Sequence, residues 1–221
     1  MDALIAENIQ LFKKQLSDHV TLVAVSKTKP VEDIREAYEA GHRDFGENRI
    51  QEMVDKHEEL PKDIRWHMIG HVQNNKIKYM ASFVNMVHGM DKPKRFKELD
   101  KEAAKHDRVI DCLLQVHIAE EESKFGFDYN EAWAFLEDKP TEKYPNLRVR
   151  GLMGMATLTD DQARIRNEFK GLRQFYDKVR TELSLKDFNI LSMGMSGDYQ
   201  WAVDEGSNMV RIGSAIFGKR Q

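Results

Sequence analysis

An alternation between short apolar runs and amphipathic stretches, repeated eight times, is the feature that most constrains the fold of this chain. Each run is rich in aliphatic residues, as in strands buried on both faces, and apolar residues at helical spacing follow it. The predicted strands are VTLVAVS, RDFGEN, IRWHMIG, VNMVHGM, RVIDCLLQVHI, LRVRGLMGMA, NILSMGMS and NMVRIG. The fifth, at residues 108–118, is expected to be the longest. Strict alternation of strand and helix predicts a parallel sheet covered by helices.

Eight such units of about 27 residues account for nearly all of the 221 residues and favour an α/β fold, the (β/α)8 TIM barrel. We expect one domain over residues 1–221, with an extra amphipathic helix at residues 1–18. An open doubly wound sheet is the alternative. It is disfavoured because AVSKTKP follows the first strand, where that fold carries a glycine-rich fingerprint.

Charge and composition exclude several classes of partner. A formal net charge of −3 indicates neither a nucleic-acid footprint nor a basic membrane patch. No stretch approaches the roughly 18 apolar residues of a membrane span, and the N-terminus lacks the pattern of a signal peptide. The single cysteine, Cys112, lies in an apolar run and fits a core thiol in a reducing compartment. The sequence therefore predicts a cytoplasmic protein without nucleic-acid or membrane partners.

Two Gly/Ser-rich turns follow the seventh and eighth predicted strands, in SMGMSGDYQWA and RIGSAIFG. In barrels these loops often bind phosphate, because glycine lets the backbone approach closely and unpaired N–H groups attract an anion. The hydroxyls of Ser196 and Ser214 add donors. Either turn alone is better read as an ordinary loop with a helix cap, but the two in adjacent positions favour a phosphate site.

Lys27 is placed at the C-terminal end of the first strand, where barrel active sites form. Apolar walls from Val23 and Val25 would favour the neutral amine that can attack a carbonyl. A Schiff-base lysine opposite a phosphate site is one reading, and a lysine snorkelling from a strand end is the other.

Arg211 lies two residues before Gly213, on the last strand. A guanidinium stays charged and can only donate hydrogen bonds. Facing a pyridine nitrogen, it would keep that nitrogen largely unprotonated and the ring a weak electron sink. The alternative is a surface salt bridge near the chain end.

Two histidines, His67 and His71, are four residues apart in WHMIGH. That spacing suits a metal only on one helix face, and here the pair straddles a strand end and a loop. No acidic or cysteine partner completes a ligand set, so no metal site is predicted.

Seven motifs, spread from Val20 to Gly218, together resemble the pyridoxal phosphate homeostasis protein family. They are AVSKTKP, FGENRIQE, WHMIGHVQNNK, ESKFG, GLMGMAT, SMGMSGDYQWA and VRIGSAIFG. The resemblance implies a barrel related to the N-terminal domain of alanine racemase, with pyridoxal 5′-phosphate (PLP) held as a Schiff base on Lys27. It implies that the other residues near the cofactor are Asn48, His67, His71, Met155, Ser196, Arg211, Gly213 and Ser214. The family more often has threonine at position 214, and serine keeps the hydroxyl.

The resemblance also implies a role in PLP homeostasis rather than robust catalysis. Related racemases and decarboxylases carry an additional β domain that supplies catalytic groups, whereas this sequence ends soon after the eighth predicted strand. We therefore expect a monomeric PLP-binding protein that is not an enzyme. PLP-requiring apoenzymes are its candidate partners, as recipients of the cofactor. A slow PLP-dependent amino-acid racemase or lyase is the main alternative, and a class I aldolase-like barrel using Lys27 without PLP is another.

Overall fold

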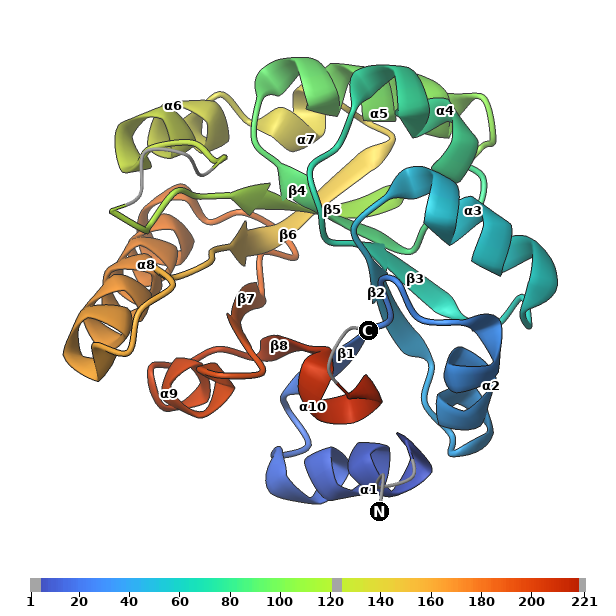
Figure 1. The fold of residues 1–221 in the computed structure, drawn as a ribbon. Coiled ribbons are helices and arrows are strands. Elements are labelled where there is room, and N and C mark those ends of the chain that lie inside the picture. The colour runs from blue at the N-terminus through green and yellow to red at the C-terminus, as the bar shows by residue number, and fades with distance from the viewer. Residues whose placement is uncertain (1–4, 121–124, 219–221) are drawn as a thin grey trace.

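Eight parallel strands form a closed barrel in the computed structural model, which describes residues 5–120 and 125–218 (Figure 1). Each strand pairs with the next along the chain, and the last pairs with the first. The strands are β1 (Thr21–Val25), β2 (Asp44–Glu47), β3 (Arg65–Met68), β4 (Met86–Met90), β5 (Ile110–Gln115), β6 (Leu147–Met153), β7 (Ile190–Met195) and β8 (Met209–Ile212). The predicted TIM barrel is confirmed. The expectation that the fifth strand is longest is wrong, because β6 has seven residues and β5 has six.

Helices connect the strands and surround the barrel, as Figure 1 shows. They are α1 (Ile5–Gln15), α2 (Val31–Glu39), α3 (Ile50–Glu59), η1 (Asn74–Lys76), α4 (Ile77–Met80), α5 (Pro93–Ala104), α6 (Tyr129–Glu137), α7 (Pro140–Lys143), α8 (Gln162–Leu183), α9 (Tyr199–Asp204) and α10 (Ser214–Phe217). The short helix α7 follows α6 directly and was not expected from the sequence. Among the described residues, none of these helices combines the length and apolarity needed to cross a bilayer.

Alternate residues of each strand point into the barrel or out toward the helices, because side chains alternate along a strand. The inward-facing apolar residues form their own cluster, made of Val23, Met86, Leu113, Met153 and Met209. A larger cluster between the outer face of the barrel and the helices includes Phe45, Trp66 and Phe169, all fully buried. The strands are thus apolar on both faces, which explains why their sequences read as continuous runs.

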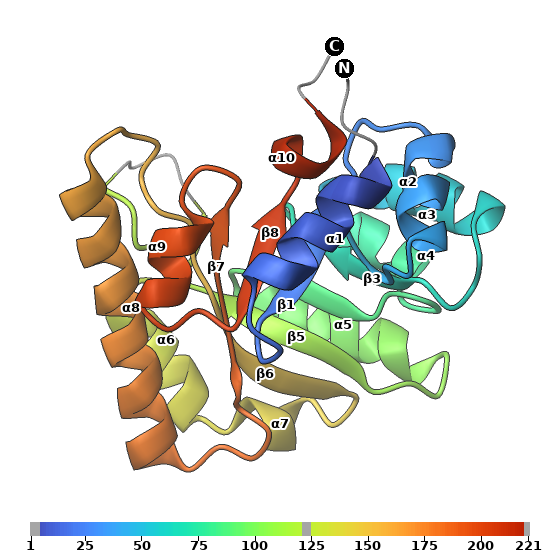
Figure 2. The ribbon, with the colours of Figure 1, turned by 90° about the horizontal axis from the view of Figure 1, so that it is seen from below.

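The N-terminal helix α1 lies outside β1 and β8, beside α2 and α10 (Figure 2). Its backbone is tied to α2, since the Ala6 amide donates to Glu36 Oε1 at 3.0 Å. Its side chains reach α10, since Asn8 Nδ2 donates to the Ile216 carbonyl at 2.9 Å. The helix therefore completes the outer ring where the two ends of the barrel sequence meet.

Helix α1 also supplies a matched pair for testing its contribution to stability. Ile9 is fully buried and Leu11 is 51% exposed. We expect Ile9→Ala to lower the free energy of unfolding by about 3 kcal/mol, through lost burial and a residual cavity. Leu11→Ala is expected to change it by less than about 0.5 kcal/mol. Urea unfolding followed by circular dichroism measures both, and equal effects would show that α1 is not packed as described.

Candidate functional site

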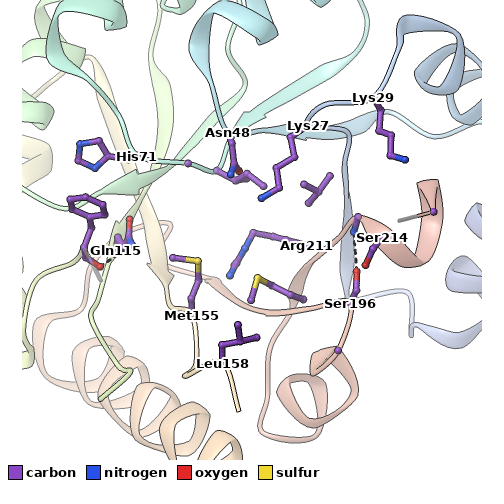
Figure 3. Close-up of a pocket in the computed structure, with 18 residues that line it drawn as sticks. Lys27, Lys29, Asn48, His71, Gln115, Met155, Leu158, Ser196, Arg211 and Ser214 are labelled. Carbon is purple, nitrogen blue, oxygen red and sulfur yellow. Dashed lines mark hydrogen bonds between the residues drawn. The ribbon is translucent and has the colours of Figure 1, made fainter. Parts of the chain in front are cut away.

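A cavity of about 590 Å³ opens at the C-terminal ends of the strands (Figure 3). Parallel strands place all their C-terminal ends on one face of the barrel, so residues distant in the sequence meet there. Eight of the nine predicted site residues line this cavity: Lys27, Asn48, His71, Met155, Ser196, Arg211, Gly213 and Ser214. The ninth, His67, does not.

Lys27 is carried on a turn directly after β1, and its half-buried side chain points into the cavity (Figure 3). The next residue, Thr28, has a φ of 64°, a conformation that costs a non-glycine residue energy. The turn is held there because the Thr28 amide donates to Glu52 Oε1 at 2.5 Å. The Lys29 amide also donates to the Ser26 carbonyl at 3.0 Å. The backbone that carries the Lys27 amine is therefore fixed on both sides.

A buried charged cluster lies beneath this turn. Glu47, fully buried, accepts from Ser26 Oγ at 2.6 Å and from Lys56 Nζ at 2.8 Å. Lys56 also donates to the Ser26 carbonyl, at 2.8 Å, and pairs with Glu52. Burial raises the pKa of Glu47 to about 7, against the opposing effects of Lys56 and Ser26. Its Oε2 has no partner among the described residues, which fits the dominance of desolvation.

The turns after β7 and β8 lie beside each other on the rim. The Gly213 amide donates to Ser196 Oγ at 3.1 Å, so the two turns are joined by a hydrogen bond. At Gly197 an added Cβ would meet no atom within 4 Å, which means that the open space reaches its backbone. Gly194, the last residue but one of β7, has a φ of 100°, a conformation that favours glycine. Helices α9 and α10 are short, so individual N–H and hydroxyl groups, more than a helix dipole, would attract an anion here.

Arg211 lies inside the barrel at the base of the cavity and is 3% exposed. Its Nη1 donates to Ser192 Oγ at 2.6 Å, and its Nη2 donates to the Gly154 carbonyl at 2.9 Å. Burial lowers the pKa of Arg211 to about 10, so the guanidinium stays charged at neutral pH. The surface salt bridge considered from the sequence is absent, since Arg211 is buried and the described residues give it no ion pair.

His71 lies on the opposite side of the cavity from Ser214 (Figure 3). Arg95 Nη2 lies 3.0 Å from His71 Nε2, and because arginine can only donate, Nε2 is the unprotonated nitrogen. The other nitrogen, Nδ1, faces Asp91 Oδ2 at 3.8 Å. Burial and the charge of Arg95 lower the pKa of His71, which favours the neutral imidazole.

His67 lies deeper in the barrel interior, away from the cavity. Its ring bonds to His88 Nε2 at 2.9 Å and to Asp44 Oδ1 at 3.0 Å. Residues four apart on an extended chain share a face but are separated by about 13 Å along it. The spacing in WHMIGH therefore puts only His71 at the mouth. His71 therefore lines the cavity and His67 does not, and contact of both histidines with one ligand stays a prediction.

Sequence reasoning missed several residues that line the cavity: Gln115, Phe125, Leu158 and Gly197. Gln115 could have been found, because it is a polar residue inside an apolar run at a strand end. The exposed apolar residues carry no such signal. Residues 122–124 of the ESKFG motif lie outside the described residues. Within the described ranges no group of three or more His, Cys, Asp or Glu side chains could hold a metal ion.

Comparison with known sequences finds similarity over nearly the whole chain. Residues 2–221 match the family described as alanine racemase, N-terminal domain. A protein of Pasteurella multocida named pyridoxal phosphate homeostasis protein is 38% identical over 224 residues, which cover 99% of this chain and 95% of that protein.

Solved structures show the same fold. PipY of Synechococcus elongatus PCC7942, without PLP, superposes with a TM-score of 0.91 at 35% identity, covering 97% of this chain and 100% of that one. The same protein with PLP bound gives a TM-score of 0.88 at 34% identity, with equal coverage. Alanine racemase of E. faecalis, at 17% identity and a TM-score of 0.73, shares the fold over 98% of this chain and 58% of its own.

The buried Glu47 carboxyl makes a prediction about stability and pH. Its pKa is raised from 4.5 to about 7 on folding, so the folded state holds this proton more tightly than the unfolded state. The resulting stabilisation is complete below about pH 4.5 and is lost as the pH rises toward 7. Glu47→Gln removes this loss. We expect the variant's free energy of unfolding, relative to the wild type, to rise by on the order of 2–3 kcal/mol between pH 4.5 and 7.

Urea unfolding at several pH values within that range measures the difference. Glu52→Gln is the matched control, because Glu52 bonds to the same Lys56 but is 24% exposed. Its stability curve should run nearly parallel to that of the wild type, because Glu52 makes the smallest of the contributions to the raised pKa of Glu47. A stability curve for Glu47→Gln that is parallel to that of the wild type would contradict the raised pKa of Glu47.

Proposed function

The chain belongs to the pyridoxal phosphate homeostasis protein family, within the wider family of the alanine racemase N-terminal domain, and on that premise we propose that it binds PLP in this cavity and takes part in PLP homeostasis. One observation carries the proposal. A lysine amine, a buried guanidinium and two joined Gly/Ser turns face the same cavity (Figure 3), and these groups suit the aldehyde, the ring nitrogen and the phosphate of PLP respectively.

The residues present fit the cofactor in size and chemistry. A cavity of about 590 Å³ is in the usual range for a small ligand, roughly 300–1,000 Å³. The open backbone at Gly197 and the hydroxyls of Ser196 and Ser214 suit three phosphate oxygens. Met155 and Ile69 supply apolar surface for a flat ring.

Lys27 is proposed as the covalent tether. When bound, PLP supplies an aldehyde carbon that condenses with an amine, forming a carbon–nitrogen bond and releasing water. The chain's part is to hold the Lys27 amine at a fixed place, through the Ser26 and Glu52 contacts of its turn. A fixed amine raises the effective concentration of the attacking group.

We propose that Arg211 favours retention of the cofactor rather than catalytic turnover of a substrate. Its charged guanidinium donates hydrogen bonds and cannot accept a proton from a ring nitrogen. The nitrogen opposite it would remain unprotonated, and the ring would withdraw electrons weakly. In this role the protein buffers a reactive aldehyde in the cytoplasm as a monomer, and PLP-requiring apoenzymes would be its recipients.

The absorbance spectrum of purified protein after incubation with PLP tests the tether. We expect a band near roughly 420 nm that Lys27→Ala abolishes. Lys29→Ala is the matched control and should keep the band, since Lys29 Nζ donates to the Phe217 carbonyl at 2.7 Å. Borohydride reduction followed by peptide mapping should place a PLP-sized adduct on Lys27. A different adduct mass would favour the aldolase-like reading, and no adduct on Lys27 would refute the assignment.

A second candidate function, slow racemisation or cleavage of an amino acid, is favoured by His71. Its neutral imidazole lines the cavity, and Nε2 could accept a proton from a bound amino acid once its hydrogen bond from Arg95 opens. Exchange of the α-proton in deuterated water, followed by NMR across a panel of amino acids, tests this function. Exchange that is lost in both Lys27→Ala and His71→Phe would support it. No exchange above the rate of free PLP would leave binding alone as the function.

A further inference from the structure

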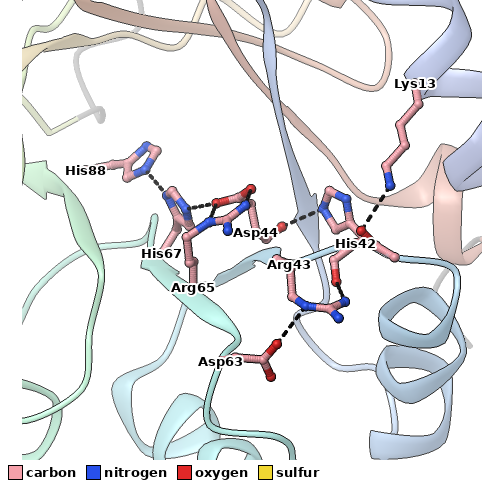
Figure 4. Close-up of polar contacts among 9 residues, drawn as sticks. Lys13, His42, Arg43, Asp44, Asp63, Arg65, His67 and His88 are labelled. Atoms are coloured by element: carbon pink, nitrogen blue, oxygen red, sulfur yellow. Dashed lines mark hydrogen bonds and ion pairs between the residues drawn. The ribbon is translucent and has the colours of Figure 1, made fainter. Parts of the chain in front are cut away.

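A relay of hydrogen-bonded polar side chains runs through the otherwise apolar interior of the barrel, from the base of the cavity to the N-terminal ends of the strands. Its members are Arg211, Ser192, His88, His67 and Asp44. Starting at Arg211, Nη1 lies 2.6 Å from Ser192 Oγ, and Ser192 Oγ lies 3.4 Å from His88 Nδ1. His88 Nε2 then lies 2.9 Å from His67 Nδ1, and His67 Nε2 lies 3.0 Å from Asp44 Oδ1. Figure 4 shows the His88, His67 and Asp44 end of this relay.

Arg211 and Asp44, at the two ends of this relay, fix the direction of every hydrogen bond in it. Arg211 can only donate, so the hydroxyl proton of Ser192 is left to point at His88 Nδ1. His88 must then carry its proton on Nε2 and donate to His67 Nδ1. His67 in turn carries its proton on Nε2 and donates to the Asp44 carboxylate, which can only accept.

Both imidazoles are neutral in this arrangement. Burial lowers the pKa of His88 well below its usual range, and the charge of Arg211 acts in the same direction. Asp44 is ionised, because Arg65 and His67 hold the pKa of its carboxyl well below its usual range. Arg65 Nε donates to Asp44 Oδ1 at 2.8 Å, and its Nη2 donates to Oδ2 at 2.5 Å.

Arg211 needs such a relay of hydrogen bonds because its charge is buried. A buried charge is costly unless it is paired or well hydrogen-bonded. Within the described ranges no carboxylate forms an ion pair with Arg211. Asp198 attracts it through space, and the Asp198 side chain accepts from the Met195 amide at 2.5 Å. Hydrogen bonds that all point the same way polarise one another, so a carboxylate at the far end stabilises the cation at the near end.

We propose that Asp44 is the remote counter-charge of Arg211, and that His67, His88 and Ser192 are positioning residues that hold its guanidinium toward the cavity. The link between this relay and PLP rests on the proposed function. The relay itself does not, because it lies wholly within the chain's own residues. It assigns a role to His67, which does not line the cavity, and to Asp44, which lies at the opposite end of the barrel.

NMR of the unliganded protein tests the relay without any cofactor. Long-range proton–nitrogen spectra should show His67 and His88 as neutral Nε2–H tautomers at pH 7. The Nη resonances of Arg211 should be distinct in the wild type, since hydrogen bonds restrict rotation of the group. Ser192→Ala should shift the Nη1 resonance, which loses its acceptor, while the bond from Nη2 to the Gly154 carbonyl remains. An Nδ1–H tautomer or an imidazolium at either histidine, or an unshifted Nη1 resonance in Ser192→Ala, would overturn the proposal.

Binding of PLP tests the consequence at the cavity. Asp44→Asn removes the counter-charge and keeps the size of the side chain. We expect it and Ser192→Ala to raise the Kd for PLP by about threefold to tenfold, as expected for weakened hydrogen bonding to a charged group, and to shift the absorbance maximum of bound PLP. Asp63→Asn is the matched control, because Asp63 pairs with Arg43 at the same end of the barrel without contacting the relay. It should leave both quantities unchanged.

Equal Kd values for Asp44→Asn and Asp63→Asn, with the wild type binding PLP, would refute a remote counter-charge. A wild-type protein that binds no PLP would refute the proposed function. The NMR spectra would then be the only test of the relay. A general loss of stability is separated from a positioning role by the absorbance maximum, which unfolding of a fraction of the molecules does not move.

Discussion

Pairing between β8 and β1 closes the barrel, and the arrangement of the site depends on that closure. The register places Val23 opposite Arg211 and Ala24 opposite Ile212. Lys27, just past the end of β1, is thereby brought across from the turn that follows β8. Without this pairing, both strands would be open edges and the amine would have no fixed relation to the guanidinium. One set of backbone hydrogen bonds thus sets the distance between Lys27 and Arg211, the two residues proposed to contact the ligand at its aldehyde and its ring nitrogen.

The fold could be predicted because strands buried on both faces give continuous apolar runs, and because eight such runs alternate with helical periods. Strand ends were harder to predict. The run at residues 108–118 continues past β5, yet Val116 forms only an isolated bridge with Phe127. The helix α7 has four residues, too few to show a period.

The site could be predicted only where a residue type is unusual for its position, as with Lys27 and Arg211 at strand ends. Residues that act through three-dimensional neighbours had no such signal. Lys56 lies on α3 and looks like any surface lysine in the sequence, but it bonds to the Ser26 carbonyl beneath the Lys27 turn. The partners of His67 were equally hidden, because Asp44 and His88 come from two other strands.

The contacts of α10 bear on the route by which a ligand reaches the cavity. On one side of the rim, Lys29 and Asn8 donate to the carbonyls of Phe217 and Ile216, so α10 is fastened to both α1 and the β1 turn. On the other side, Leu158 is 91% exposed and Phe125 is half exposed. Opening the fastened side would break two hydrogen bonds, whereas passage over the apolar side breaks neither. A ligand that enters over Phe125 and Leu158 would leave both contacts of α10 in place, which gives the rim a fastened side and an open side.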